Sequence, residues 1–541
     1  MKKLKYILLG LFVALTTSCN DDFLDNEPLS FLTTDQYYLT PNQIEIALNG
    51  VYNILSANQV QGFGNNSTFS RNMMVMLNGA TDEAVVRDVN INPNYVDWGD
   101  GSFTAQSNFV NESWAFLYAG VNRANTLIER IESVEGFDGN RKEEIIAEAR
   151  VLRGFYHMML SMMHGGIPIY ESTSEDPLKA RNTIEEVYTS IIADYEYGYQ
   201  ILGNRAVILG RVNKWTAAGL LAKAHTYLAS AKNSGLNGYL NINSFDWVDS
   251  NQHYTAAFTY TQDIINNSGY QLTPNYDYLF RETTKQQQYD ENLFAVEGSN
   301  DPSTNVVNIV VNAFIPQGNV NVTGGGFGWY RPLSELYNKY IEADFRRDHN
   351  VTGNLNSVNN FEFIEGIKYF VPRNLPNLNV GFTCIGKYRM IDPSLKTLPN
   401  WASNINLPLL RYADILLLHA EAQFFLGDEP GARTTLSLVR ERSVANGFTV
   451  ADLNNAYQRG DFVQELLEER SRELCFENWR RIDLARFNKY DETINSLSTN
   501  GFYNERMVPV LQANWRSERV WFPIPTIQLD LNANLIQNQG Y

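Results

Sequence analysis

Apolar residues recur at helical spacing through long stretches of this chain, and this periodicity constrains the fold more than any other feature. The clearest stripe runs through residues 141–163 and ends at a Gly-Gly-Ile-Pro sequence. Its apolar members stand three or four positions apart: Ile145, Ala149, Leu152, Tyr156, Met159 and Met163. Similar stripes predict helices over 183–202 and 211–231. The second of these is rich in Ala and Gly, which let helices approach closely.

A pair of helices is predicted over residues 410–442. The first helix stops at Gly427, and the second restarts after Pro430. Gly just past a helix end and Pro near the next start are the expected signals. The pair has roughly the size of a tetratricopeptide repeat, but no regular 34-residue period runs along the chain. The sequence therefore predicts a mostly α fold of degenerate, repeat-like helix pairs.

Two long stretches, residues 60–110 and 290–405, are rich in Gly, Asn, Ser, Pro and aromatic residues. This turn chemistry predicts loop-rich insertions that contain short strands. Loops of this length are usually functional or disordered. Their aromatic content favours a functional role.

The charge balance excludes one large class of function. The chain has 541 residues, with 43 Lys and Arg against 60 Asp and Glu, which gives a net charge of −17. Nucleic-acid binding needs clustered basic residues, so we expect no nucleic-acid partner. The 29 Phe, 30 Tyr and 9 Trp residues can either fill a core or offer flat faces to a ligand.

The N-terminus has the pattern of an export signal. Residues 1–18 combine three lysines, an apolar run and small residues, and this segment is too short to span a bilayer as a mature helix. The junction with Cys19 resembles a bacterial lipobox, although Thr16 departs from its aliphatic preference. Cys19 is then the lipid anchor, and 19–541 is the mature chain. The alternative is an ordinary signal peptide with an incidental cysteine.

Several patterns of catalytic chemistry are missing from the sequence. Cys384 and Cys475 lack the spacing of a zinc or thiol-exchange motif, and the six histidines form no HExxH sequence. There is neither a GxSxG elbow nor a Walker loop. We expect no cofactor. Acidic loops containing Asp97 and Asp100 could bind calcium, but no EF-hand spacing exists, so the question of a metal stays open.

An ordered set of segments resembles the SusD/RagB family of surface glycan-binding lipoproteins from Bacteroidetes. The matching segments follow the family's order along nearly the whole mature chain: 19–25, 148–156, 165–168, 210–218, 410–417, 419–422, 469–470, 473–477, 480–484, 522–525 and 537–541. The acidic start after Cys19 also resembles the surface-export signal of these lipoproteins. The resemblance divides the body approximately into an N-terminal part, 19–235, and a C-terminal part, 236–541.

The resemblance implies a fold, a partner and a location. The fold is mostly α, built of tetratricopeptide-like helix pairs with loop-rich insertions. Family members bind glycans without catalysis and cap a TonB-dependent outer-membrane transporter. The expected location is therefore the cell outer membrane, lipid-anchored and facing the medium.

The resemblance also suggests a ligand site. A sugar stacks its apolar face on an aromatic ring and directs its hydroxyls toward polar groups. By similarity to the family's glycan site, Trp98 and Trp329 are the predicted stacking rings, and their Gly and polar neighbours place them in loops. The neighbouring candidates are Tyr95, Asp97, Asp100, Tyr330 and Arg331. Core packing is the alternative for each ring.

Two other functions are the alternatives to glycan binding. Hydrolysis of a glycoside needs a pair of carboxyl groups, and the available pairs are Asp97 with Asp100, Asp82 with Glu83, and Glu469 with Glu473. The last pair lies in an alternating charge run, in which Glu468 with Arg472 and Glu477 with Arg481 stand four residues apart and predict a structural charge network. The second alternative is a helical docking scaffold for an outer-membrane partner, with a non-glycan ligand such as a peptide.

Overall fold

The computed structural model describes residues 37–56, 68–236, 238–281, 284–298, 314, 328–353, 361–364, 367–370, 383–388, 405–501 and 503–541. Cys19 and the predicted signal segment lie outside these ranges, as does most of the glycine-rich approach to Trp329.

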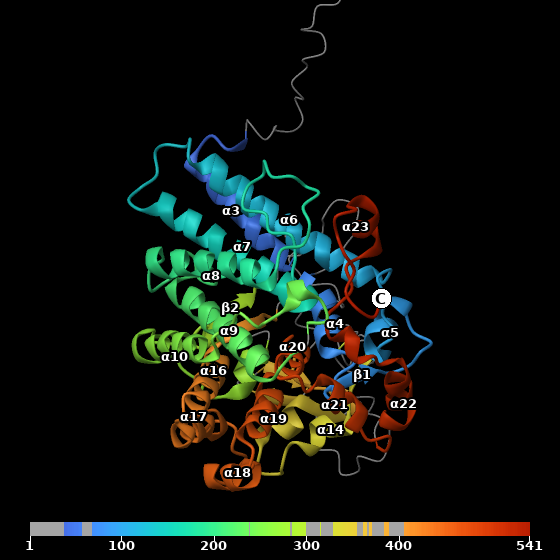
Figure 1. Cartoon of the computed structure of the whole chain (residues 1–541). Helices are drawn as coiled ribbons and strands as arrows, with labels where there is room; N and C mark the ends of the chain where they lie inside the picture. The colour runs from blue at the N-terminus through green and yellow to red at the C-terminus, as the bar shows by residue number, and fades with distance from the viewer. Residues whose placement is uncertain are drawn as a thin grey trace, which may run out of the picture.

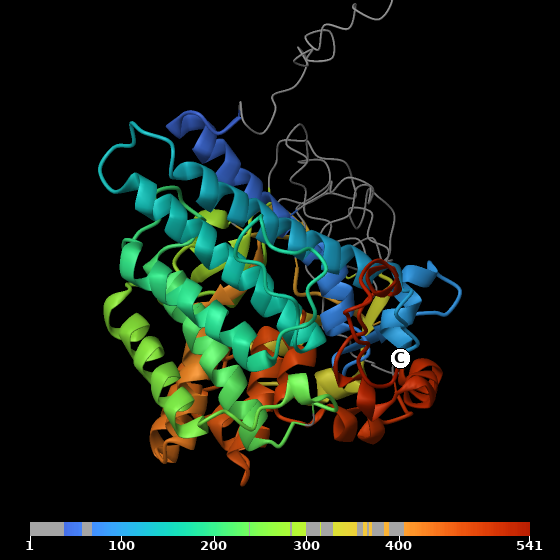
Figure 2. The ribbon, with the colours of Figure 1, turned by 45° about the horizontal axis from the view of Figure 1, so that its top comes forward.

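Long helices stacked one on the next form one side of the molecule (Figure 1; Figure 2). In chain order they are α3 (Pro41–Ser56), α6 (Asn108–Ile131), α7 (Arg141–His164), α8 (Ile184–Ile201), α9 (Lys214–Asn233), α10 (Ser250–Asn267), α16 (Tyr412–Phe425) and α17 (Glu429–Glu441). Each packs on its successor, from α3 and α6 at the top of Figure 1 to α17 near the bottom. The predicted mostly α fold of helix pairs is confirmed.

The predicted helix boundaries hold because local signals set them. Thr183 and Glu186 form a reciprocal capping box at the start of α8. Between α16 and α17, Gly427 adopts φ +95°, a conformation that glycine reaches without strain, and Pro430 stands in the first turn of α17. Two starts were predicted too early. The helix predicted from residue 211 begins at Lys214. Leu410 and Arg411 end a strand, and α16 begins only at Tyr412.

The second half of the chain adds short helices around the C-terminus. These are α18 (Val450–Tyr457), α19 (Phe462–Leu474), α20 (Arg480–Arg486), α21 (Tyr490–Ser496), α22 (Asn504–Asn514) and α23 (Thr526–Leu531), with a 3₁₀ turn η7 (Ser517–Val520). Other short helical segments are α11 (Lys285–Gln288), α14 (Ser334–Asn338), α15 (Phe345–Asn350), η3 (Asn241–Asn243) and η4 (Tyr276–Phe280). α23 returns to lie beside α6 (Figure 1).

The described strands pair into four small antiparallel ribbons. They are β1 (Ala84–Val86) with β3 (Tyr330–Pro332), β2 (Asn292–Val296) with β8 (Leu407–Arg411), β4 (Val351–Gly353) with β7 (Thr383–Ile385), and β5 (Phe361–Ile364) with β6 (Ile367–Phe370). Short strands were expected in 290–405. Three of the ribbons, however, join segments distant in sequence, which no local pattern predicts.

The expectation of loops over 60–110 was partly wrong. The described part of this stretch contains a π-helical segment η2 (Thr68–Met73) and the helices α4 (Met74–Asn78) and α5 (Pro93–Asp100). α5 has its own signals: the Asn92 side chain accepts a hydrogen bond from the Asn94 amide at 3.1 Å, Pro93 begins the helix, and Gly101 ends it at φ +76°. These turn-forming residues are caps of a short helix.

The main hydrophobic core extends through both parts of the chain. Its buried members run from Ile44 in α3 to Leu535 near the C-terminus. The stacked helices approach closely where glycine faces a neighbour. A Cβ at Gly198 of α8 would lie 2.2 Å from Cγ2 of Val151 in α7. The C-terminal segment is therefore part of the same core as the first helices.

Candidate functional site

The β1–β3 ribbon brings the two predicted ligand segments together. Val86 pairs with Tyr330, and α5 packs against β1. The amide of Arg87 donates to the carbonyl of Trp329 at 2.6 Å, which fixes the backbone just before β3. Segments about 230 residues apart in sequence therefore share one small region of the molecule.

Trp329 lies at the partly exposed edge of this region. Its half-buried ring stands edge-on to Tyr95, with centroids 4.3 Å apart and an interplanar angle of 63°. Tyr95 in turn stands edge-on to Phe109, and its hydroxyl accepts a hydrogen bond from Nε of Arg71 at 3.1 Å. The Arg71 guanidinium also lies 4.8 Å from the Phe109 ring centroid. Aromatic and cation–π contacts thus hold the rings in fixed orientations.

Trp98 occupies a different environment from the predicted one. It belongs to α5, not to a loop, and only 1% of its surface is exposed. Phe103 stacks on its indole at 4.4 Å with an interplanar angle of 8°, and Phe522 packs edge-on at 4.9 Å. Among the described residues, its Nε1 has no hydrogen-bond partner. In this arrangement Trp98 is part of the core beneath the region of Trp329.

The two candidate carboxylates serve the turn between α5 and α6. Asp97 is half-buried, and its Oδ2 accepts a hydrogen bond from the hydroxyl of Ser107 at 2.8 Å. Asp100 is buried, and its Oδ1 accepts from the amide of Ser102 at 3.0 Å. Burial raises the pKa of Asp100 above its ordinary value. Both groups therefore already have structural partners.

Tyr330 and Arg331 are buried on β3. The Tyr330 hydroxyl donates to the carbonyl of Tyr95 at 2.7 Å, which ties β3 to α5. Arg331 donates to the carbonyl of Thr383 at 3.0 Å and also contacts the sulfur of Cys384. Of the seven predicted site residues, Trp329 and Asp97 keep partial exposure, and the other five are buried.

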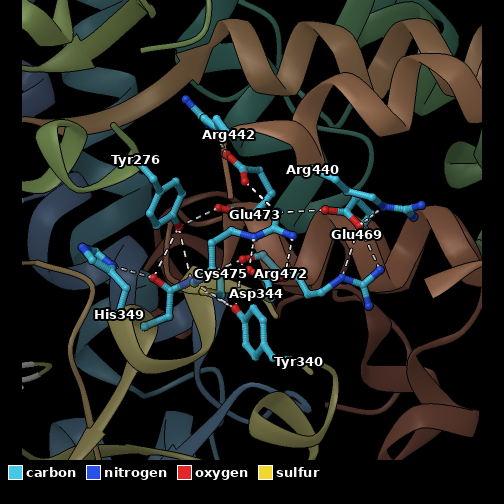
Figure 3. A network of polar contacts seen from close by, with 12 residues as sticks. Tyr276, Tyr340, Asp344, His349, Arg440, Arg442, Glu469, Arg472, Glu473 and Cys475 are labelled. Atoms are coloured by element: carbon cyan, nitrogen blue, oxygen red, sulfur yellow. Dashed lines mark hydrogen bonds and ion pairs between the residues drawn. The ribbon is translucent and has the colours of Figure 1, made fainter. Parts of the chain in front are cut away.

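A second polar region is a buried network of ion pairs (Figure 3). Arg346 of α15 binds Glu469 and Glu473 of α19 at 2.8 Å each. Arg411 binds Glu473 at 2.6 Å, and Arg440 binds Glu469 at 2.8 Å. The predicted structural charge network is therefore present around these two carboxylates, and it joins segments from across the second half of the chain.

Electrostatics in this network favour ionised carboxylates. Burial opposes the charge on Glu469, but Arg472, Arg346 and Arg440 outweigh it and lower the pKa of Glu469 below its ordinary value. One predicted ion pair of the run was correct, since Arg472 lies 3.5 Å from Glu468. The other predicted ion pair, Glu477 with Arg481, was wrong.

The pairing of Glu477 shows why. α19 ends at Leu474, so Glu477 does not share a helix with Arg481. Glu477 is held instead by Arg411 at 2.8 Å and by Lys387 at 2.5 Å. These partners come from distant segments, which the spacing along a helix could not indicate.

Cys384 and Cys475 are buried free thiols, and burial raises the pKa of Cys384 to about 11. Within the ranges that the structure describes, no cluster of three or more His, Cys, Asp or Glu side chains could hold a metal ion. Nor does any helix in those ranges have the length and apolar character needed to cross a bilayer.

Comparison with known proteins identifies the family. Residues 246–541 match the model of the SusD family, and residues 22–228 match a model described as starch-binding and associating with the outer membrane. The first match covers more than half of the chain. The chain therefore belongs to the SusD family.

Individual relatives agree with this assignment, one of them over the whole length. The SusD-like protein P25 of Formosa agariphila is 22% identical, with 100% of both chains covered. A SusD-like protein of Bacteroides ovatus is 25% identical over 78% of this chain and 72% of its own. The starch-binding protein SusD of Bacteroides thetaiotaomicron is 30% identical over 25% of this chain and 22% of its own.

Solved structures share the fold. A SusD homologue from Bacteroides thetaiotaomicron has a TM-score of 0.71 at 22% identity, covering 94% of this chain and 98% of its own. Surface glycan-binding protein A of the same organism, solved in complex with laminarihexaose, has a TM-score of 0.70 at 20% identity and covers 92% and 99%. At these identities the likeness establishes the fold.

Proposed function

We propose that this protein binds an oligosaccharide or polysaccharide at the cell surface and delivers it to a TonB-dependent outer-membrane transporter, without catalysing a reaction. The single observation that carries the glycan part is the position of Trp329, a half-buried ring held edge-on to Tyr95, whose hydroxyl accepts a hydrogen bond from Arg71. An aromatic ring with nearby polar groups is the combination that a sugar requires.

Named relatives support this ligand class. Surface glycan-binding protein A was solved with laminarihexaose, and another structure of the same fold was solved with a xylogluco-oligosaccharide. The latter has a TM-score of 0.69 at 20% identity. These ligands belong to those proteins, and here they serve as the first probes.

The residues of the proposed site differ in role. Trp329 is the proposed stacking ring. Asp97 is proposed to contribute a polar contact to the ligand, and Tyr95 packs edge-on against Trp329. Trp98, Asp100, Tyr330 and Arg331 are buried beneath or beside it, so we propose that they hold the site in shape. The turn contacts of Asp97 and Asp100 favour this structural role over glycoside hydrolysis.

The proposed location rests on the N-terminal sequence and the family description. Cys19 follows an export-type segment, and the second matching family associates with the outer membrane. We propose that lipid on Cys19 anchors the protein with its body facing the medium. The transporter is the proposed protein partner.

A calorimetric titration tests the glycan site. The full-length chain, purified in a zwitterionic detergent without a sugar headgroup, is titrated with laminarihexaose, a xylogluco-oligosaccharide and malto-oligosaccharides. We expect saturable binding to one class, with Kd from roughly micromolar to millimolar. Trp329→Ala should weaken binding by about 2-fold to 12-fold, the equivalent of about 0.5–1.5 kcal/mol for a lost aromatic contact.

Trp247→Ala is the matched control, because Trp247 is also half-buried but lies in the segment before α10. Its replacement should leave the affinity unchanged. Equal weakening by both variants would remove Trp329 from the site. No binding to any glycan in the panel would instead favour the docking scaffold with a non-glycan ligand such as a peptide.

A further inference from the structure

A groove whose lining differs from that of the Trp329 region lies along α6. It is bounded by α6, by the segment 168–178 that follows α7, and by α23, and its volume is about 460 Å³. Binding sites for small molecules commonly have volumes of about 300–1,000 Å³. None of its lining residues is among the seven predicted site residues.

Three aromatic rings form the floor and one wall of the groove. Trp114 and Tyr118 of α6 lie 5.0 Å apart, and Tyr170 stands edge-on to Tyr118 at 5.8 Å. The Tyr118 hydroxyl donates to the carbonyl of Pro168 at 2.8 Å, and that of Tyr170 donates to the carbonyl of Pro177 at 2.9 Å. Both rings are therefore fixed before any ligand arrives.

The walls are also connected to each other. The Asn532 side chain donates to the carbonyl of Lys179 at 2.9 Å, and that of Asn534 donates to the carbonyl of Leu178 at 2.7 Å. Arg181 donates to the carbonyl of Ile536 at 2.9 Å. The C-terminal segment and the segment after α7 thus form one rigid wall, and a preformed site loses less entropy on binding.

The lining offers polar groups but no unbalanced charge. Asn122 of α6 and Gln528 of α23 present primary amides on opposite sides of the groove. The one charged lining residue, Glu175, is paired with Lys179 and accepts from two backbone amides, at 2.6 and 2.9 Å. Such a lining suits a neutral ligand with hydroxyl groups.

Apolar side chains complete the rim. Leu178 and Leu531 are 47% and 67% exposed and stand at the groove. Large apolar side chains left in water beside a preformed cavity mark a surface that gains from being covered. The ligand therefore needs an apolar face as well as hydroxyl groups, a combination found in a pyranose ring.

We propose that this groove is a second saccharide site, which binds one neutral pyranose unit of a glycan against Tyr118 and Tyr170. The inference deepens the proposed function and rests on it for the choice of a saccharide ligand. It assigns glycan contacts to α6 and α23, outside the region of Trp329.

Two variants test the groove by different means. Tyr170→Ala removes a wall ring, whereas Ala115→Trp keeps every ring and fills the space, because Ala115 is a half-buried lining residue of α6. Tyr197→Ala is the matched control, because Tyr197 of α8 is also a half-buried tyrosine with a cation near its ring. The Arg150 guanidinium lies 4.3 Å from the Tyr197 ring centroid, and the Lys179 ammonium lies 5.4 Å from that of Tyr170. Thermal unfolding of each variant checks that it is folded.

The measurement is titration of the full-length chain in the same detergent with the oligosaccharide panel and with glucose, galactose, mannose and xylose. We expect both groove variants to weaken oligosaccharide binding at least 3-fold and to reduce saturation-transfer NMR signals from one monosaccharide. Tyr197→Ala should change neither readout.

The outcomes separate this inference from the proposed function. If Trp329→Ala weakens binding but the groove variants do not, the second site is wrong and the proposed function stands. If only the groove variants weaken binding, the groove is a saccharide site and the assignment to Trp329 is wrong. If no sugar binds to the wild type, both fail.

Discussion

Neighbouring carboxyl groups of this protein have pKa values shifted in opposite directions because their partners differ. Asp82 forms two hydrogen bonds with Arg480 and one with Lys339 at 2.8 Å. These cations outweigh burial and lower the pKa of Asp82 below its ordinary value. Glu83 is equally buried but accepts from the hydroxyl of Ser471 at 2.8 Å, and burial raises its pKa from 4.5 to about 7. Proximity in sequence therefore says little about charge.

The raised pKa of Glu83 predicts a pH dependence of stability. The folded protein keeps the Glu83 proton up to a higher pH than the unfolded chain does. Its contribution to the free energy of unfolding is thus present below pH 4.5 and is lost as the pH rises from 4.5 to about 7. Glutamine cannot ionise. Between low and high pH, the free energy of unfolding of Glu83→Gln should therefore fall by up to about 3 kcal/mol less than that of the wild type. Urea unfolding at pH 5 and pH 8 measures it, and parallel pH profiles of variant and wild type would contradict it.

At the scale of elements, the spacing between helices depends on individual glycines. Gly198 of α8 faces Val151 of α7, and a Cβ there would lie only 2.2 Å from a methyl group. Gly50 of α3 is also helical, but a Cβ there would meet no atom within 4 Å. The same residue type therefore has a packing role at one position and none at the other.

This contrast predicts opposite effects of one substitution. Gly198→Ala should destabilise the protein by about 1–3 kcal/mol because α7 and α8 must separate. Gly50→Ala should stabilise it by about 0.5–1 kcal/mol, since alanine favours the helix and nothing obstructs it. Chemical unfolding of both variants is the measurement. Equal effects of the same sign would show that α7 and α8 are not in close contact.

At the scale of the whole molecule, the main hydrophobic core joins the N-terminal helices to the C-terminal segment. The proposed function requires this folded body to be held at the membrane. Cys19 lies outside the described residues, so the anchor is argued from its sequence context. The stretch that contains Phe522 and α23 packs on Trp98 and also lines the groove, so one C-terminal stretch reaches both regions.

Cys19→Ala tests the anchor. Lipid attachment needs this thiol, so the variant should move from the membrane fraction to the soluble fraction when cells are lysed and centrifuged. A Ser18→Ala variant is the control, because it changes the adjacent residue but keeps the thiol. Membrane association of Cys19→Ala equal to that of wild type would disprove lipid anchoring through Cys19.

The sequence alone predicted α7, α8, α9, α16 and α17, but it did not predict α3, α6 or α10, and it missed much of the candidate site. The stripe through Ile145 and Tyr156 is a local pattern, so α7 could be predicted to within one residue at its C-terminal end. For α5, the caps Asn92 and Gly101 were interpreted as loop residues, because turn formers mark both loops and helix ends. Trp98 therefore was expected in a loop and lies instead in a buried helix.

The groove could have been suspected only in part. Trp114 and Tyr118 stand four apart, which on a helix is the usual pattern of core residues, but the sequence alone did not predict α6. Their role in lining a groove depends on Tyr170 and on α23, which arrives from more than 400 residues away. No spacing within α6 indicates that partner.

By itself, the sequence determined the family, the helical class and, to within a few residues, the extents of α7, α8, α9, α16 and α17, because periodicity and capping act within a few residues of each other. The tertiary structure decided which rings are buried and which line a surface. Trp98 is covered by Phe522, and Trp329 meets Tyr95, through contacts that close long loops of chain. Burial depends on such distant partners, and therefore only the folded chain distinguishes a core ring from a candidate binding ring.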